Sequence, residues 1–111
     1  MKTTQLTQGK TRRVMYVESK GEPIEGAAAR VGWVTFSQTG RTVEYKGLRL
    51  GRIKGGGYSG NFIDPETGTV YWVSGIKRRD SNAHPAEAGI VVAVDPDAMD
   101  EYKIIRSGAG V

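Results

Sequence analysis

Residues 30–46 read RVGWVTFSQTGRTVEYK, and this stretch decides the fold class. Its first part, Arg30 to Ser37, is rich in β-branched and aromatic residues, which favour extended strands. The three residues Gln38-Thr39-Gly40 are typical of a short turn, and Thr42 to Lys46 alternates polar and apolar residues again. The stretch therefore predicts a β-hairpin.

The same period of two extends through most of the chain. Further strands are predicted at residues 12–18, 48–53, 61–63, 69–74 and 90–94. The parity of the apolar residues slips at Gly51, which predicts a β-bulge there. The residues Asp64 to Gly68 are typical of a turn and predict a second hairpin. The continuous apolar run Ile90 to Val94 predicts the most buried strand.

One segment near the C-terminus favours a helix. Asp95 is suited to the N-cap, Pro96 to the first helical position, and apolar residues follow at helical spacing until Gly108. The fold is therefore predicted to be mainly β, a small antiparallel, strongly bent sheet or Src-homology-3-like barrel with one short C-terminal helix. Residues 1–10 are expected to form a flexible N-terminal arm, and residues 11–111 a single β-rich domain.

Composition excludes several classes of protein. The 111-residue chain has no cysteine, so disulfides and thiolate metal sites are excluded. Its longest unbroken apolar run has five residues, far fewer than a membrane span needs. The polar N-terminus lacks the apolar stretch of a secretory signal. We therefore expect a cytoplasmic protein with no membrane partner.

Positive charge is concentrated in the first half of the chain. Residues 1–54 carry eleven Lys and Arg against four Asp and Glu, whereas residues 55–111 carry five against eight. A clustered positive potential attracts phosphate chains, although charge also serves solubility alone. The expected partner is a nucleic acid or an acidic protein surface. The candidate partner-binding residues are eight cations and two stacking aromatics, namely Arg41, Lys46, Arg49, Arg52, Lys54, Lys77, Arg78, Arg79, Trp33 and Trp72.

No set of residues predicts catalysis, a metal or a cofactor. Gly55 to Gly60 matches G-x-G-x-x-G, but a strand follows it instead of the helix of a dinucleotide site, so we expect a flexible connection or a mobile binding loop. Asp64 and Glu66 are better explained as turn residues than as metal ligands. His84, the single histidine, is the one candidate general base. We therefore expect a protein that is not an enzyme.

Several stretches of the chain occur together in one known pattern: YVESK at 16–20, ARVG at 29–32, TFS at 35–37, TGRT at 39–42, YKG at 45–47, DPETG at 64–68 and YWVSG at 71–75. This pattern resembles a family of small, uncharacterised bacterial proteins of about this length. The resemblance implies a β-rich cytosolic protein and brings no active site. Such proteins sometimes carry the name 1-deoxyxylulose-5-phosphate synthase. This name does not fit a chain of 111 residues, because a thiamine-diphosphate enzyme needs several large α/β domains.

Three hypotheses for function follow from these observations. The first is a non-enzymatic barrel that binds a nucleic acid or another acidic partner through a basic face, with Arg49, Arg52 and Lys54 on the same side as residues 77–79. The second is an inhibitor, immunity or antitoxin-type module that presents the same aromatic and arginine surface to a protein. The third, which is weaker, is a small hydrolase or nuclease that uses His84.

Overall fold

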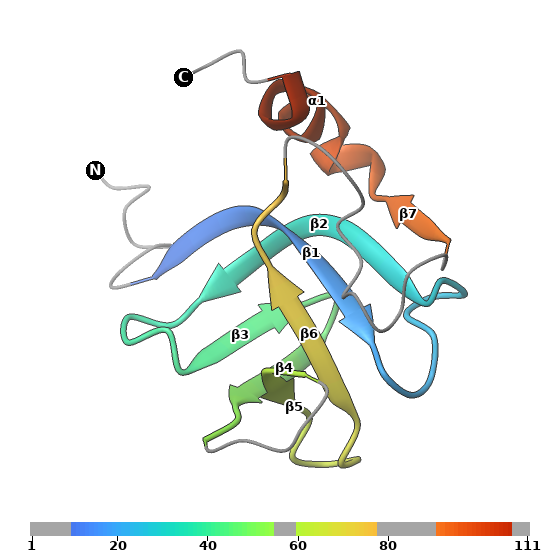
Figure 1. Ribbon diagram of the computed structural model, residues 1–111. Helices are drawn as coiled ribbons and strands as arrows, with labels where there is room; N and C mark the ends of the chain where they lie inside the picture. The colour runs from blue at the N-terminus through green and yellow to red at the C-terminus, as the bar shows by residue number, and fades with distance from the viewer. Residues whose placement is uncertain (1–9, 55–59, 78–90, 108–111) are drawn as a thin grey trace.

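Six strands form a closed antiparallel barrel in the computed structural model, which describes residues 10–54, 60–77 and 91–107. The strands are β1 (Thr11–Ser19), β2 (Ala29–Phe36), β3 (Thr42–Tyr45), β4 (Leu48–Arg52), β5 (Phe62–Ile63) and β6 (Val70–Ser74). Each strand pairs with the next along the chain, and β6 closes the barrel by pairing with β1 (Figure 1). This architecture confirms the predicted fold class.

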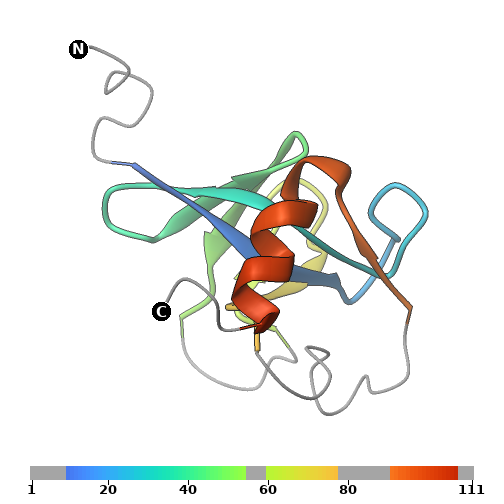
Figure 2. The ribbon, with the colours of Figure 1, turned by 90° about the horizontal axis from the view of Figure 1, so that it is seen from above.

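Three further elements lie outside the barrel. Strand β7 (Val92–Val94) pairs in parallel with the start of β2, and the 3-10 turn η3 (Pro96–Ala98) leads into α1 (Met99–Ser107). Seen from above, α1 lies across the outside of β1 (Figure 2). The predicted short C-terminal helix is therefore confirmed. The predicted N-terminal arm falls almost entirely on residues 1–9, which lie outside the described residues.

Both predicted hairpins are present, and turn chemistry explains each of them. Gly40, between β2 and β3, has a φ of 75°, and its N–H donates to the Ser37 carbonyl at 2.9 Å. Gly68, between β5 and β6, has a φ of 78°, and its N–H donates to the Asp64 carbonyl at 2.8 Å. A positive φ is strained for residues with a Cβ, so glycine suits both positions.

Two apolar clusters stabilise the molecule, one on each side of the barrel wall. The inner cluster fills the barrel and consists of Met15, Val17, Ile24, Val34, Val43, Tyr45, Leu50, Phe62, Tyr71 and Val73. The outer cluster lies between the barrel and the C-terminal elements, and its buried members are Val14, Tyr16, Ala29, Val31 and Ala98. Alternate residues of β1 contribute to the two clusters because successive side chains of a strand point to opposite faces.

The prediction that residues 90–94 form the most buried strand is wrong. Val92 and Val94 are only half-buried against the outer cluster, and Val91 is 78% exposed. The strand β7 pairs with only three residues of β2, Ala29 to Val31, outside the closed barrel. The continuous apolar run therefore corresponds to an edge strand, β7, that packs against the outside of the barrel, and not to a central strand.

The predicted β-bulge at Gly51 is also absent, since β4 pairs in unbroken register with β3 from Leu48 through Gly51. Arg52 continues the inward-facing set after Leu50, because the strand ends at the opening of the barrel, where an inward side chain reaches solvent. The irregular pairing lies at Asn61, where the backbone N–H donates to the Tyr71 carbonyl at 2.9 Å one residue out of register. The Asn61 carboxamide then bonds both the N–H and the C=O of Val73, each at 2.8 Å.

Candidate functional site

Three arginines lie at one end of the barrel, which we call the arginine end: Arg13, Arg41 and Arg52. Arg13 lies directly opposite Val34 in the ladder, and Arg52 lies directly opposite Phe62. Val34 and Phe62 both belong to the inner cluster, and residues opposite each other in an antiparallel pair share a face. The Arg52 N–H donates to the Arg41 carbonyl at 2.8 Å, so Arg41 lies opposite Arg52. All three side chains therefore belong to the inward-facing rows at the barrel's opening.

An aromatic floor lies beneath the arginine end. The guanidinium carbon of Arg52 lies 4.8 Å from the centroid of the Phe62 ring, a distance at which a cation and a ring attract. Phe36 packs against the inner cluster from the end of β2 and is only partly buried. The three arginines themselves are exposed. Phe62 itself is buried, so of these two rings Phe36 is the one that is partly open to solvent at this end.

The charges of the arginine end are paired less than the charges at the opposite end of the barrel. Within the described part of the chain, Arg13, Arg41 and Arg52 form no ion pair with a carboxylate. By contrast, Lys20 pairs with Glu18 at 2.6 Å and Arg30 with Asp95 at 2.9 Å. The arginine end consequently carries positive charge that no described neighbour neutralises.

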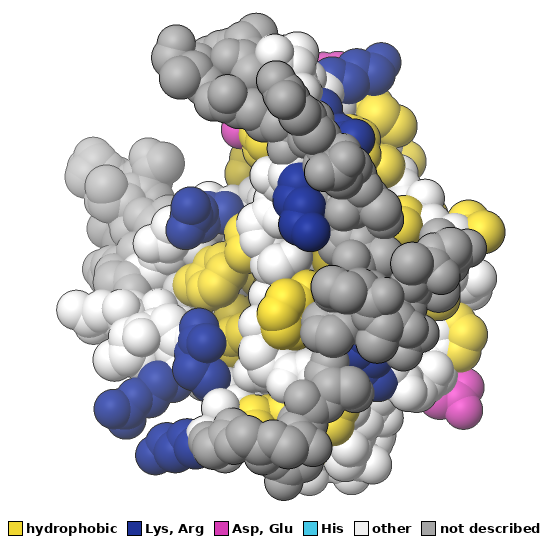
Figure 3. All heavy atoms as spheres, viewed as in Figure 1, with side chains coloured by type: hydrophobic (Ala, Val, Ile, Leu, Met, Phe, Trp, Pro, Cys, Tyr) yellow, Lys and Arg dark blue, Asp and Glu magenta, His cyan; other side chains and the backbone are white. Residues whose placement is uncertain are grey.

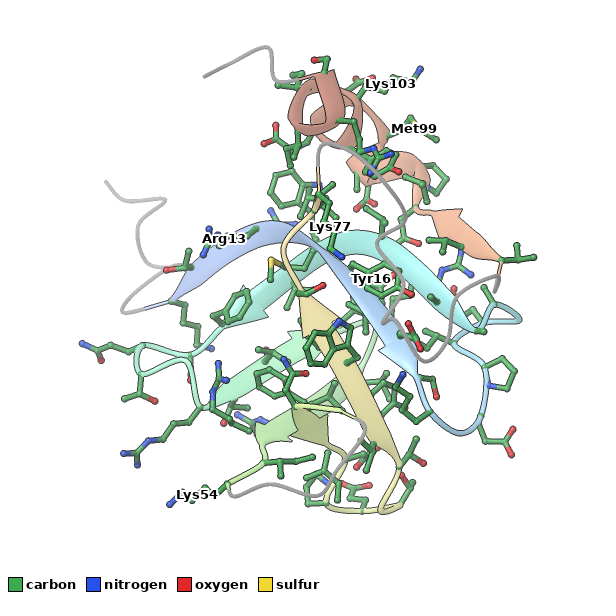
Figure 4. The ribbon with its side chains drawn as sticks, viewed as in Figure 1. Arg13, Tyr16, Lys54, Lys77, Met99 and Lys103 are labelled. Atoms are coloured by element: carbon green, nitrogen blue, oxygen red, sulfur yellow. The ribbon has the colours of Figure 1, made fainter. Side chains whose placement is uncertain are left out.

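Charge is distributed unevenly over the view of Figure 3. Several dark-blue Lys and Arg side chains lie at the left and lower left, with others at the centre and top, and the largest area of acidic side chains is at the lower right. Figure 4 places Arg13 and Lys54 on that left side, whereas Lys77 lies near the middle, beyond the end of β6. Lys54 follows Arg52 by two residues and is exposed.

Two of the candidate cations, Lys46 and Arg49, lie away from the arginine end. Arg49 is directly opposite Glu44 on the outer face of the barrel wall and pairs with it at 3.4 Å. Lys46 lies at the β3–β4 turn, at the other end of the barrel, and pairs with Glu25 at 3.3 Å. The structure therefore groups Arg52 with Arg41 and Lys54, and it separates this group from Arg49.

Both candidate tryptophans lie on the outside of the barrel. Trp33 packs against the outer cluster, donates its indole N–H to the Asp97 carbonyl at 3.0 Å, and carries the Arg12 guanidinium 4.8 Å above its ring. Trp72 lies directly opposite the buried Glu18 and packs against the same cluster. Both rings help to cover the outer cluster, and neither belongs to the arginine end.

Other candidate residues lie outside the described part of the chain. These are Arg78, Arg79 and His84, together with residues 55–59 of the glycine-rich stretch. Gly60 is described, and a Cβ at that position would come within 2.3 Å of the Tyr71 carbonyl oxygen. This contact gives Gly60 a structural reason to be glycine.

A network of charged and polar groups occupies the opposite end of the barrel. The Asp95 carboxylate accepts hydrogen bonds from Arg30 Nε at 2.9 Å and from the Tyr45 hydroxyl at 2.6 Å. The hydrogen bond to Asp95 raises the pKa of Arg30, and burial, with the same carboxylate, raises the pKa of Tyr45. Asp95 occupies the predicted N-cap position, but its side chain makes no capping hydrogen bond because it is engaged here. The network fastens the C-terminal segment to the barrel.

Arg12, Arg13 and the role of Phe62 were not predicted from the sequence. The signal was present in strand parity: Arg13 shares a face with Met15, and Arg52 shares a face with Leu50, so both point inward at strand ends. Arg49 and Arg52 are three residues apart in one strand and therefore point to opposite faces. Counting charges along the chain does not reveal this separation.

The chain matches no family model, no curated protein and no solved structure at a significant level. Over residues 10–54, 60–77 and 91–107, no group of three or more His, Cys, Asp and Glu is arranged to hold a metal ion. Over the same residues, no helix has the length and apolar character needed to cross a membrane.

Proposed function

We propose that this protein is a non-enzymatic binding module that holds single-stranded nucleic acid at the arginine end of its barrel. The observation that supports the proposal most is the set of three exposed arginines, Arg13, Arg41 and Arg52, that no described carboxylate pairs. Guanidinium groups bind phosphate oxygens through paired N–H donors. A nucleic-acid ligand also fits a cytoplasmic location, which we include in the proposal.

The aromatic floor favours a single strand over a duplex. Proteins that bind single strands combine a positive surface along the backbone with aromatic rings on which bases stack. At the arginine end, Phe36 is partly exposed and Phe62 lies under Arg52. A splayed base reaches a partly exposed ring such as Phe36, whereas the paired bases of a duplex do not; Phe62 is buried under Arg52 and is not open to stacking.

The position of the acidic residues supports the same surface. Glu25, Asp64 and Asp95 all lie toward the opposite end of the barrel, where Glu25 and Asp64 line a cavity of about 300 Å³ and Asp95 holds Arg30. These three carboxylates therefore lie away from a phosphate chain bound at Arg41 and Arg52. Lys54, which follows β4, would extend the positive surface outward, away from the barrel.

The test is a binding titration with a fluorescein-labelled oligo(dT) of about 12 nucleotides, a length within the usual site sizes of single-strand binders. Arg41→Gln/Arg52→Gln removes two charges from the arginine end and is expected to weaken binding roughly tenfold or more. Arg49→Gln is the matched control, since it removes a charge from the same strand on the opposite face. It is expected to leave affinity within about twofold.

Two outcomes would overturn the proposal. One is that the folded wild-type protein does not bind the oligonucleotide at about 50 mM salt, where phosphate contacts are strong. The other is that Arg49→Gln weakens binding as much as the double variant does. Thermal unfolding is measured for each variant, so that weaker binding can be distinguished from loss of the folded structure.

A further inference from the structure

The N-terminal half of β1 has an edge to which no described strand is paired. β1 pairs with β2 along its length, from Thr11 to Glu18, but it pairs with β6 only from Tyr16 to Ser19. β6 ends at Ser74, and the described chain beyond it, Gly75 to Lys77, forms no further ladder. An unpaired strand edge is a template for pairing with another extended chain.

The ladder fixes which backbone groups point to this edge. The Ser19 N–H donates to the Ala28 carbonyl, so odd-numbered residues of β1 bond with the β2 side. The Lys20 N–H donates to the Val70 carbonyl, so even-numbered residues bond with the β6 side. The N–H and C=O of Arg12 and Val14 therefore point to the side where β6 no longer runs.

A slot of about 520 Å³ lies beside this edge. Its walls are Arg12, Arg13, Val14, Met15 and Trp33 on one side and Gly75, Ile76, Glu101 and Ile105 on the other. On the outer face the slot is largely apolar, with Val14, Ile76 and Ile105. On the inner face it opens toward Arg13, and Glu101 is the single acidic residue among the described residues that line it.

We propose that an extended acidic peptide of a partner protein adds to β1 in this slot as an antiparallel strand. Its backbone pairs with Arg12 and Val14, as in other complexes formed by strand addition. Peptide residues opposite Arg12 and Val14 lie on the outer face, where Val14, Ile76 and Ile105 favour apolar side chains. The alternate residues lie on the inner face beside Arg13, whose charge favours carboxylates.

The first test measures the edge itself, without any ligand. Amide hydrogen exchange followed by NMR is expected to be fast for Arg12 and Val14 and slow for Arg13 and Met15, whose N–H groups bond with β2. Addition of a probe peptide of alternating Val and Glu is expected to slow exchange at Arg12 and Val14. Slow exchange at Arg12 and Val14 in the free protein would show that the edge is already covered, and would overturn the proposal.

The second test uses modified forms of the same probe. N-methylation of its valines removes the N–H groups that face β1 and is expected to abolish binding, whereas N-methylation of its glutamates is expected to leave binding nearly unchanged. A Val-Lys peptide of the same length is expected not to bind. Equal effects of the two methylations, or equal binding of the lysine peptide, would contradict strand addition.

The third test uses variants of the protein. Arg12→Ala and Arg12→Pro both remove the guanidinium, but only proline also removes the backbone N–H; an edge position without an internal ladder bond tolerates this loss. Arg12→Pro is therefore expected to bind the probe at least about fivefold more weakly than Arg12→Ala, with both variants folded by NMR. Equal affinities would overturn the backbone pairing. Protection of Arg12 and Val14 by the oligonucleotide, and not by the peptide, would instead assign this edge to nucleic acid.

Discussion

The carboxylate of Asp95 lies against the bare Cα of Gly32. A Cβ built on Gly32 would come within 2.2 Å of Asp95 Oδ2 and 2.7 Å of a ring carbon of Tyr45. The absence of a side chain at Gly32 thus makes room for the contacts that hold the C-terminal segment to the barrel. Asp95 and Arg30 are 65 residues apart in the chain. The space left at Gly32 therefore serves a contact between distant parts of the sequence.

Gly32→Ala tests this relationship. The added methyl group must displace Asp95 or Tyr45, and overpacking of this kind is expected to lower the free energy of unfolding by about 1–3 kcal/mol. Gly51→Ala is the matched control, because Gly51 also lies in a strand and a Cβ there meets nothing within 4 Å. Urea unfolding measures both variants. Equal stability of Gly32→Ala and Gly51→Ala would contradict the contact.

Tyr45 is expected to make stability fall at alkaline pH. Burial and the hydrogen bond to Asp95 raise its pKa above the ordinary value, and burial also raises the pKa of Tyr71. The unfolded chain therefore loses these phenolic protons first, so the stabilisation is complete below about pH 10 and decreases as the pH rises further. Tyr45→Phe is expected to be less stable at neutral pH and to show a shallower alkaline decline in urea unfolding. An unchanged slope above about pH 10 would contradict this assignment.

Asn61 is expected to be essential to the β5–β6 pairing. Its carboxamide bonds both backbone groups of Val73, and Asn61→Ala leaves that N–H and C=O without these partners. The expected loss is about 1–3 kcal/mol of unfolding free energy. Asn61→Asp keeps the acceptor and removes the donor, so it is expected to retain the Val73 N–H bond and lose the C=O bond. Amide hydrogen exchange at Val73 distinguishes Asn61→Ala from Asn61→Asp, because only the second variant keeps the acceptor of the Val73 N–H. Equal protection of the Val73 N–H in both variants would contradict the assignment.

The sequence predicted those parts of the structure that depend on residues close together in the chain. The turns at Gly40 and Gly68 depend on residues within a few positions of each glycine, and both hairpins were predicted correctly. The role of Asp95 could not be predicted in this way, because its partners Arg30 and Tyr45 are brought to it only by barrel closure. A side chain engaged elsewhere in the fold is no longer available as an N-cap.

The candidate site was only partly predictable for the same reason. Strand parity separates Arg49 from Arg52, but that Arg13 and Arg41 lie at the same end of the barrel as Arg52 is recognised only once the register of β1 to β5 is known. The sequence contains the charges, and the ladder determines which of them share an end of the barrel. Arg78, Arg79 and His84 lie outside the described residues, so their roles stay predictions.

The salt dependence of oligonucleotide binding tests the central claim most directly. Each phosphate contact on a single strand contributes roughly −0.7 to the slope of log affinity against log salt concentration. Arg41→Gln/Arg52→Gln is therefore expected to reduce the steepness of the wild-type slope by about 1.4, while Arg49→Gln leaves it unchanged. A wild-type slope near zero, or the same slope in the double variant as in the wild type, would contradict nucleic-acid binding at the arginine end.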